Sequence, residues 1–218
     1  MICSAVPPTY SLVRAVVLAL GLLLATAACT GDPDPDRSAP SSSATTTPRT
    51  PTTQPSRQPA SAPFRVRVTR VSGTLGNQAR STGARNVGRV LSAYVDAAFL
   101  RGPYPRSDFA GSFATFTPGA ARTARRDQAL LTNQRLGPST ESVRAVRRAA
   151  YLSVLAPYKV AAGITANIDL DLLVERSAGP PERVRVNGRL LLTRDRDGGW
   201  TIFGYDVSRS DTPARSGS

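Results

Sequence analysis

Asp169 and Asp171 are the candidate carboxylates for acid–base chemistry, because two neighbouring carboxyl groups can divide the roles of acid and base between them. The segment 164–176 that holds them alternates apolar and polar residues, as a half-buried strand does. This alternation places both carboxylates on the polar face, where surface ion pairs are their expected role. A carboxylate-dependent isomerase or hydrolase therefore stays an alternative, and we assign no catalytic residue.

The chain lacks the residues that several common kinds of catalytic site require. There is no histidine, and the two cysteines, Cys3 and Cys29, precede any segment that could form a core. Ser-His-Asp catalysis, Cys-His catalysis and zinc sites of the ordinary ligand types are therefore excluded. No glycine-rich loop is followed by lysine, so there is no P-loop. We expect no cofactor, no metal site and no disulfide, and a protein that binds or scaffolds in preference to an enzyme.

Three tyrosines are the candidate ligand contacts. Tyr205 is the polar-tipped residue on the predicted inner face of the last strand, and Tyr94 and Tyr151 are expected near it. A tyrosine combines a large apolar ring with a hydroxyl that can bond to a ligand at the mouth of a cavity. The alternative is that the hydroxyl of Tyr205 only reaches the edge of the sheet.

Basic residues are concentrated in one part of the chain. The net charge is +13, and positions 64–148 hold 15 basic and 4 acidic residues. Such a surface can hold anionic lipid headgroups or wall polymers, although a solvated helix face would have the same composition. Nucleic acid is not expected as a partner, because no basic motif is interleaved with aromatic residues. The candidate anion-binding residues are Arg85, Arg89, Arg122, Arg125 and Arg126.

The N-terminus predicts export and lipidation. Arg14 precedes an apolar run at 15–28, which is shorter than the roughly 20 residues of a bilayer-spanning helix. A basic flank, a short apolar run and a small-residue end indicate a signal peptide at 1–28. The sequence Thr26-Ala27-Ala28-Cys29 resembles the bacterial lipobox, which implies that Cys29 is acylated and anchors the chain in membrane lipid. An uncleaved signal anchor and an incidental cysteine are the alternatives.

A linker follows the cysteine. Residues 29–63 are rich in Ser, Thr and Pro and contain no large apolar side chain until Phe64. Such a segment cannot bury enough surface to offset its chain entropy, so it is predicted to be disordered. Residues 210–218 are predicted to form a second disordered tail, which leaves 64–209 as the folded domain.

The folded domain begins with a strand at 64–71 and continues with helices. Apolar residues then recur at steps of three and four, which predicts a helix that begins near Ser81 or Thr82 and ends at Gly102. A short helix behind a Ser107 cap would follow, and another from Thr117-Pro118 to about position 133. The buried faces of the first two helices are predicted to contain Val87, Val90, Leu91, Tyr94, Val95, Ala98 and Phe99, and then Phe109, Phe113 and Phe116.

Four strands are predicted in the last third of the chain, at 143–158, 164–176, 183–194 and 200–207, with a helical start left open for the first. Opposite charges favour a hairpin register that pairs the second strand with the third. This register sets Glu175 opposite Arg183, Asp169 opposite Arg189 and Asp171 opposite Asn187. The next hairpin sets Phe203 opposite Leu192 and Tyr205 opposite Leu190.

These elements predict an α+β fold, with N-terminal helices packed on a curved antiparallel sheet of about four strands. The helix ARNVGRVLSAYVDAAFL and the strands IDLDLLVERSAGPPERVRVNGRLLLTRDRDGGWTIFGYDV resemble the nuclear transport factor 2-like (cystatin-like) superfamily over residues 82–208. The resemblance implies a cone-shaped domain. The closing DGGWTIFGYDV is also similar to mammalian-cell-entry-associated envelope proteins, which implies a position outside the membrane.

The expected protein is therefore a lipid-anchored binding or scaffold domain on the extracytoplasmic face of the bacterial cell membrane. Its expected partners, beyond the membrane lipid, are an envelope protein complex or an apolar ligand held between helix and sheet. Binding of anionic lipids or wall polymers by an arginine-rich surface is the first alternative, and the carboxylate-dependent enzyme is the second.

Overall fold

The computed structural model describes residues 60–214. The predicted signal peptide, Cys29 and nearly all of the predicted linker lie outside these residues. Within them the fold is α+β, as predicted, with helices and a five-stranded, mostly antiparallel sheet that does not close on itself. No helix in this part of the chain is both long enough and apolar enough to cross a bilayer.

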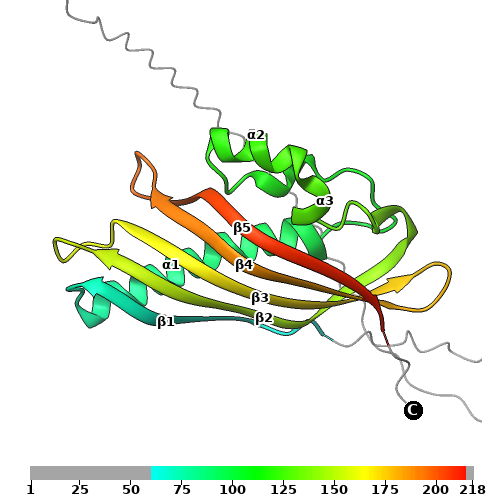
Figure 1. Ribbon diagram of the computed structural model, residues 1–218, viewed down its shortest axis with the longest axis horizontal. Helices are drawn as coiled ribbons and strands as arrows, with labels where there is room; N and C mark the ends of the chain where they lie inside the picture. The colour runs from blue at the N-terminus through cyan, green and yellow to red at the C-terminus, as the bar shows by residue number, and fades with distance from the viewer. Residues whose placement is uncertain (1–59, 215–218) are drawn as a thin grey trace, which may run out of the picture. The chain divides into compact units, whose positions relative to one another are not determined.

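The sheet follows the order of the sequence, so its first and last strands form its two edges (Figure 1). The first strand runs parallel to the second, and all other neighbours are antiparallel. The strands are β1 (Phe64–Gly73), β2 (Thr140–Ala156), β3 (Gly163–Arg176), β4 (Glu182–Arg194) and β5 (Trp200–Pro213).

The strand predicted at 64–71 belongs to the sheet as a fifth, parallel strand. Parallel strands need a long crossover connection, and all the helices of residues 60–214 lie between β1 and β2. The segment before β1 is also attached to the sheet, since the amide of Ala62 donates to the Ala145 carbonyl at 2.8 Å. Residues 61–63 were predicted to belong to the linker, but Ser61 also accepts a hydrogen bond from the Ala145 amide at 3.0 Å.

The predicted register of the β3–β4 hairpin is wrong by two residues. Leu173, and not Glu175, pairs with Arg183, while Asp171 pairs with Arg185 and Asp169 with Asn187. Arginines at alternate positions of β4 offer opposite charges in several registers, so charge pairing alone could not choose between them. Because side chains alternate with a period of two, the slip leaves every residue on its predicted face.

A second predicted pairing is wrong because the β4–β5 hairpin contains a bulge. Tyr205 lies opposite Leu190 as predicted, but the register shifts after Leu191, and Ile202 takes the predicted place of Phe203 opposite Leu192. A bulge inserts one extra residue and reverses the alternation beyond it. Phe203 is therefore 49% exposed.

The strand β5 is longer than predicted. It continues to Pro213, although the alternation indicated an end at position 207 and residues 210–213 were assigned to the tail. Two charged side chains in this extension are nearly buried, because Arg209 and Asp211 form an ion pair at 2.7 Å. A charged segment could thus join the sheet because its charges are paired within it.

The main helix, α1 (Asn77–Val95), begins before the predicted caps and continues into a π-helical turn, η1 (Asp96–Leu100). Ser81 lies inside the helix, where its hydroxyl donates to the carbonyl of Asn77 at 2.8 Å, so it does not cap the N-terminus. The predicted buried face is confirmed: six of its residues are buried and Val90 is partly buried.

The remaining helices are shorter than predicted. A 3-10 turn, η2 (Ala110–Phe113), takes the place of the short helix predicted behind Ser107, and the amide of Ala110 donates to Oδ1 of Asp108 at 2.8 Å. The three phenylalanines predicted to be buried in this region are buried. The next helix starts at Thr117-Pro118 as predicted, with the Thr117 hydroxyl as its N-cap, but the chain leaves helical geometry at Asp127. One predicted helix is therefore two, α2 (Pro118–Arg126) and α3 (Gln128–Leu131), and a second 3-10 turn, η3 (Gly137–Ser139), leads into β2.

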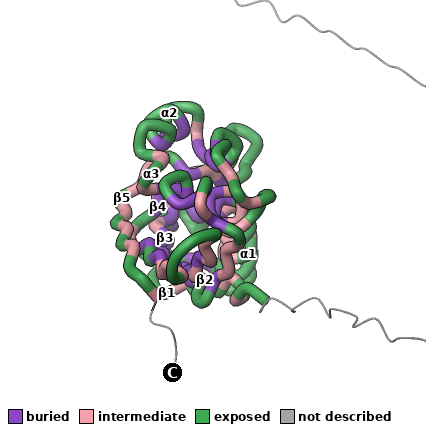
Figure 2. The backbone as a smooth tube through the Cα atoms, turned by 90° about the vertical axis from the view of Figure 1, so that its right-hand side faces the viewer, coloured by how far each residue is buried: buried purple, intermediate pink, exposed green. Residues whose placement is uncertain are grey.

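The core lies between α1 and the inner face of the sheet. Helix α1 contacts both β1 and β5, the two edge strands, and α2 and α3 pack against β5. Figure 2 shows the buried stretches gathered where the strands face α1, with exposed residues around them. The apolar positions of the strand alternation fill this core, so the residues between them must face the other side of the sheet.

Substitution of two glycines, one in a crowded position of the sheet and one in an open position of α1, tests the packing of the fold. Gly188 has φ +139° in β4, and a Cβ there would lie 2.3 Å from the Asp206 carbonyl oxygen, whereas a Cβ at Gly83 in α1 would meet nothing within 4 Å. Gly188→Ala should lower the free energy of unfolding by about 2 kcal/mol or more. Gly83→Ala should raise it by about 0.5–1 kcal/mol. Urea unfolding followed by the fluorescence of the single tryptophan, Trp200, measures both, and equal effects would contradict this packing.

Candidate functional site

The structure separates the five predicted anion-binding arginines into two groups. Arg85 and Arg89 lie on α1 beside β1, whereas the other three lie exposed on α2, which packs against β5 at the opposite edge of the sheet. The two groups therefore cannot form one site. Arg85 and Arg89 border a groove that also has apolar walls, and this groove is the candidate site.

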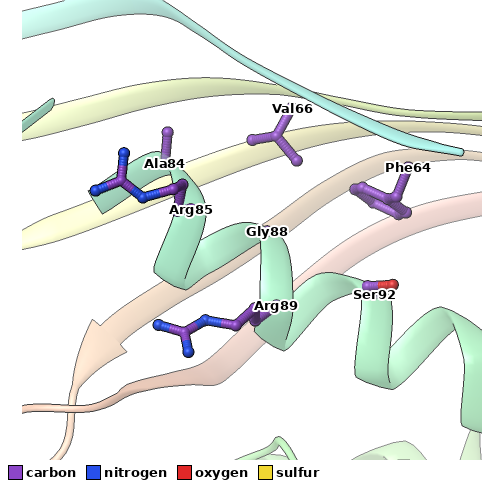
Figure 3. A pocket seen from close by; sticks show the side chains of 7 residues that line it. All are labelled: Phe64, Val66, Ala84, Arg85, Gly88, Arg89 and Ser92. Atoms are coloured by element: carbon purple, nitrogen blue, oxygen red, sulfur yellow. The ribbon is translucent and has the colours of Figure 1, made fainter. Parts of the chain in front are cut away.

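The groove lies between α1 and β1 and has a volume of about 700 Å³. Phe64 and Val66 contribute apolar surface from β1, and one face of α1 contributes the rest (Figure 3). Its lining residues are Phe64, Val66, Ala84, Arg85, Gly88, Arg89 and Ser92. We call it the α1–β1 groove.

Gly88 sets the depth of the α1–β1 groove. A Cβ at this position would lie 3.2 Å from Cγ2 of Val66, so the absence of a side chain lets the helix approach the strand closely. Small residues on this face of α1, Ala84 one turn earlier and Ser92 one turn later, leave open space on either side. The result is an apolar floor formed by half-buried Phe64 and Val66.

Arg85 and Arg89, one helical turn apart, form a cationic rim at the edge of this apolar floor. Each guanidinium bonds to a neutral neighbour, Arg85 to the Thr82 hydroxyl at 2.9 Å and Arg89 to the side-chain oxygen of Asn86. Among residues 60–214, neither arginine has a carboxylate within ion-pair distance. Both are therefore able to bind an external anion.

A shielded ion pair fixes the end of the groove nearest Ser92. Nη1 of Arg148 lies 2.7 Å from Oδ1 of Asp96, and the Ser92 hydroxyl donates to the other oxygen of this carboxylate at 3.3 Å. Nε of Arg148 also donates to the Ala62 carbonyl at 2.7 Å. This network joins α1, β2 and the segment before β1, so it positions both walls of the groove.

Tyr94 and Tyr205 lie close together, but their hydroxyls are already bonded within the protein. Tyr94 is buried and donates to the Leu131 carbonyl at 2.8 Å, and burial raises the pKa of its hydroxyl well above the usual range. Tyr205 donates to Oδ2 of Asp127 at 2.6 Å. Desolvation, followed by this bond, raises the pKa of Tyr205 to about 12. Phe116 packs edge-on against both rings, so the two tyrosines join the helices to β5.

Tyr151 does not join them, because it lies on the outer face of the sheet. Its neighbours along β2, Ala150 and Leu152, belong to the core, so the alternation turns Tyr151 the other way. Its hydroxyl accepts a hydrogen bond from Arg147 at 3.2 Å. The three candidate tyrosines therefore do not share one cavity.

Asp169 and Asp171 also lie on the outer face, in ion pairs. Asp169 contacts Nε of Arg147 at 2.8 Å, and Asp171 accepts two hydrogen bonds from Arg183, the first from Nε at 2.7 Å. Asp171 is only 9% exposed, so this pair is more shielded than the alternation indicated. Residues 60–214 contain no cluster of three or more side chains that could hold a metal ion.

The outer face also gathers arginines that the sequence reasoning did not group. They belong to three strands and meet only through the sheet register, although arginine at alternate positions of β1 and β4 was a visible signal. These residues are Arg65, Arg67, Arg147, Arg183 and Arg185.

The chain matches no protein-family model, and comparison with curated proteins and with solved structures finds no match.

The ion pair at the end of the groove can be tested against an exposed pair. Asp96→Asn would leave the shielded guanidinium of Arg148 without its counter-charge, and should lower the free energy of unfolding by about 2–3 kcal/mol. Asp206→Asn removes an ion pair with Arg189 whose two side chains are mostly exposed, and should change it by less than about 0.5 kcal/mol. Urea unfolding measures both variants. A similar change in the two would show that the shielded pair contributes no more to stability than the exposed one.

Proposed function

We propose that this chain is a lipid-anchored, extracytoplasmic binding domain of the bacterial cell envelope, and that the α1–β1 groove holds an amphiphile with an apolar chain and an anionic headgroup. The observation that carries the proposal is an apolar floor bordered by Arg85 and Arg89, which have no carboxylate partner among the described residues. The lipobox-like sequence before Cys29 supports the anchor.

Both parts of such a ligand have a physical counterpart in the groove. Each methylene buried against Phe64 and Val66 contributes about 0.8 kcal/mol, so a short acyl chain gains useful affinity from an open apolar floor. A guanidinium fork matches the geometry of phosphate and carboxylate groups. Because Arg85 and Arg89 project from the same side of α1, they can hold a headgroup while the chain lies along the floor.

The α+β arrangement supports assignment of the domain to the nuclear transport factor 2-like superfamily. A long helix packed on an antiparallel sheet is the plan that this resemblance implies, and the parallel strand β1 is an addition to it. Similarity to mammalian-cell-entry-associated envelope proteins supports a site outside the membrane. An envelope protein complex remains a proposed second partner.

The state of the polar side chains supports binding over catalysis. Tyr94 and Tyr205, the predicted ligand contacts, and Asp171, a candidate carboxylate for acid–base chemistry, are each bonded to a protein group. A general acid or base must instead reach a substrate proton. The α1–β1 groove offers guanidinium groups and apolar surface, which are suited to recognition.

Two variants separate the apolar and ionic parts of the proposed site. Ala84→Leu fills the floor, and the double variant Arg85→Gln/Arg89→Gln removes the rim charge. Each should weaken binding of a short-chain phosphatidylglycerol at least about tenfold, measured by calorimetry. Added salt should weaken binding to Ala84→Leu but hardly affect the double variant, because only the rim is screened.

Matched controls exist on the same elements. Ala93→Leu places the same side chain on the exposed side of α1, and Arg122→Gln/Arg125→Gln removes two charges from α2. Both should bind as the unmodified chain does. If the lipid binds equally to all four variants, the α1–β1 groove is not its site.

The anchor has its own test, independent of the groove. Cells that express the chain are fed an alkyne fatty acid, and the label on the protein is measured after fractionation. The unmodified chain and Cys3→Ser should carry the label in the membrane fraction, whereas Cys29→Ser should carry none, since it lacks the thiol that is acylated. Label retained by Cys29→Ser would refute lipidation at this residue.

A further inference from the structure

A second recess lies on the outer face of the sheet, on the other side of β1 from the groove. Its volume is about 890 Å³, and residues from β1, β2, β3 and β4 line it together with the segment before β1. We call it the outer recess. Its lining residues are Ala62, Pro63, Arg65, Val66, Arg67, Val146, Arg147, Arg148, Ala149, Tyr151, Asp171 and Arg183.

The sheet register forms the outer recess. Arg65 pairs with Ala149, which in turn pairs with Asp169, so the methyl side chain of Ala149 lies between an arginine and a carboxylate in this row. In the next row Arg67 pairs with Tyr151. Ala149 is only 6% exposed and forms the floor, while the longer side chains around it form the walls.

One wall is part of the backbone and is held firmly. The segment before β1 contributes Ala62 and Pro63, and Ala62 is fixed by two hydrogen bonds. Its amide donates to the Ala145 carbonyl at 2.8 Å, and its carbonyl accepts from Nε of Arg148 at 2.7 Å. The recess is therefore present before a ligand arrives.

The electrostatic balance in the outer recess is positive. Asp169 and Asp171 are occupied by Arg147 and Arg183, respectively. Arg65 and Arg67 are exposed, and the salt bridges of residues 60–214 include neither of them. Two guanidinium groups thus face the recess without a counter-charge, and the hydroxyl of Tyr151 stands beside them.

A further recess adjoins the first and continues the basic surface toward the end of β5. It has a volume of about 730 Å³ and shares Val146 and Arg183 with the outer recess. Arg144 and Arg185 add two more guanidinium groups there, and Asp171 is the nearest carboxylate to Arg185, at 3.8 Å. Basic groups therefore extend across the sheet from β1 to β4, which suits a ligand with a row of anionic groups.

We propose that this outer face binds a linear polyanion bearing phosphate or carboxylate groups, and that Arg65 and Arg67 hold successive groups of it in the outer recess. Alternate residues of a strand lie about 6.6–6.8 Å apart, so the two arginines can engage neighbouring anionic groups of one polymer. A guanidinium fork binds such groups in two-pronged hydrogen bonds. The site lies on the opposite face from the α1–β1 groove and does not depend on it.

The test compares two double variants that remove the same charge. Arg65→Gln/Arg67→Gln alters the outer recess, and Arg122→Gln/Arg125→Gln alters exposed arginines of α2 that lie elsewhere. Binding of long-chain inorganic polyphosphate to the full chain is measured by calorimetry. The first variant should weaken binding at least about tenfold and the second less than about twofold. Arg65→Lys/Arg67→Lys should give an intermediate loss, because lysine keeps the charge but not the fork.

Three results would overturn the proposal. Equal losses in the two glutamine variants would show that polyphosphate responds only to net charge. Orthophosphate that binds as tightly as polyphosphate would show a site for a single ion. Phosphatidylglycerol vesicles that bind as tightly as polyphosphate, and are released by Arg65→Gln/Arg67→Gln, would show that this face binds a lipid surface. Trp200 fluorescence under urea confirms that each variant is folded.

Discussion

The structure depends on one packing constraint, the burial of alternate residues of the sheet against α1 and the shorter helices. Leu91 and Tyr94 of the helix share a core with Leu152, Leu170 and Leu190 of three strands. Because strand side chains alternate, filling this core assigns each intervening residue to the outer face. The apolar interior and the charged exterior of the sheet are therefore two consequences of the same packing.

The strand β1 contributes residues to both proposed sites, one from each of its faces. Its residues Phe64 and Val66 face the helix and form the floor of the α1–β1 groove, while Arg65 and Arg67 face the other way and border the outer recess. Four consecutive residues thus supply apolar contacts on one side and guanidinium groups on the other. The network around Arg148 joins the start of this strand to α1 and β2, so it supports both sites together.

The fate of the carboxylates and tyrosines illustrates how a folded chain uses groups that could do chemistry. Asp127, which lies between α2 and α3, accepts a hydrogen bond from the hydroxyl of Tyr205. Asp171 accepts two hydrogen bonds from the guanidinium of Arg183 on the next strand. Buried or shielded polar groups need partners, because an unpaired one costs free energy. Because these carboxylates and hydroxyls form structural contacts, the groups available to bind a ligand are the arginines that have no carboxylate partner among residues 60–214.

The sequence by itself determined the α+β class, the buried face of α1, the start of α2 at Thr117-Pro118 and the face on which each residue of β3 and β4 lies, because these follow from local periodicity and local backbone preference. Only the tertiary structure decided that β1 pairs in parallel with β2, which of the possible registers joins β3 to β4, and where the bulge that exposes Phe203 lies. It also decided that Arg85 and Arg89 border a groove and that Arg65 and Arg67 meet Arg147 and Tyr151. These features arise between segments far apart in the chain, where several pairings satisfy the same alternation and close packing selects one.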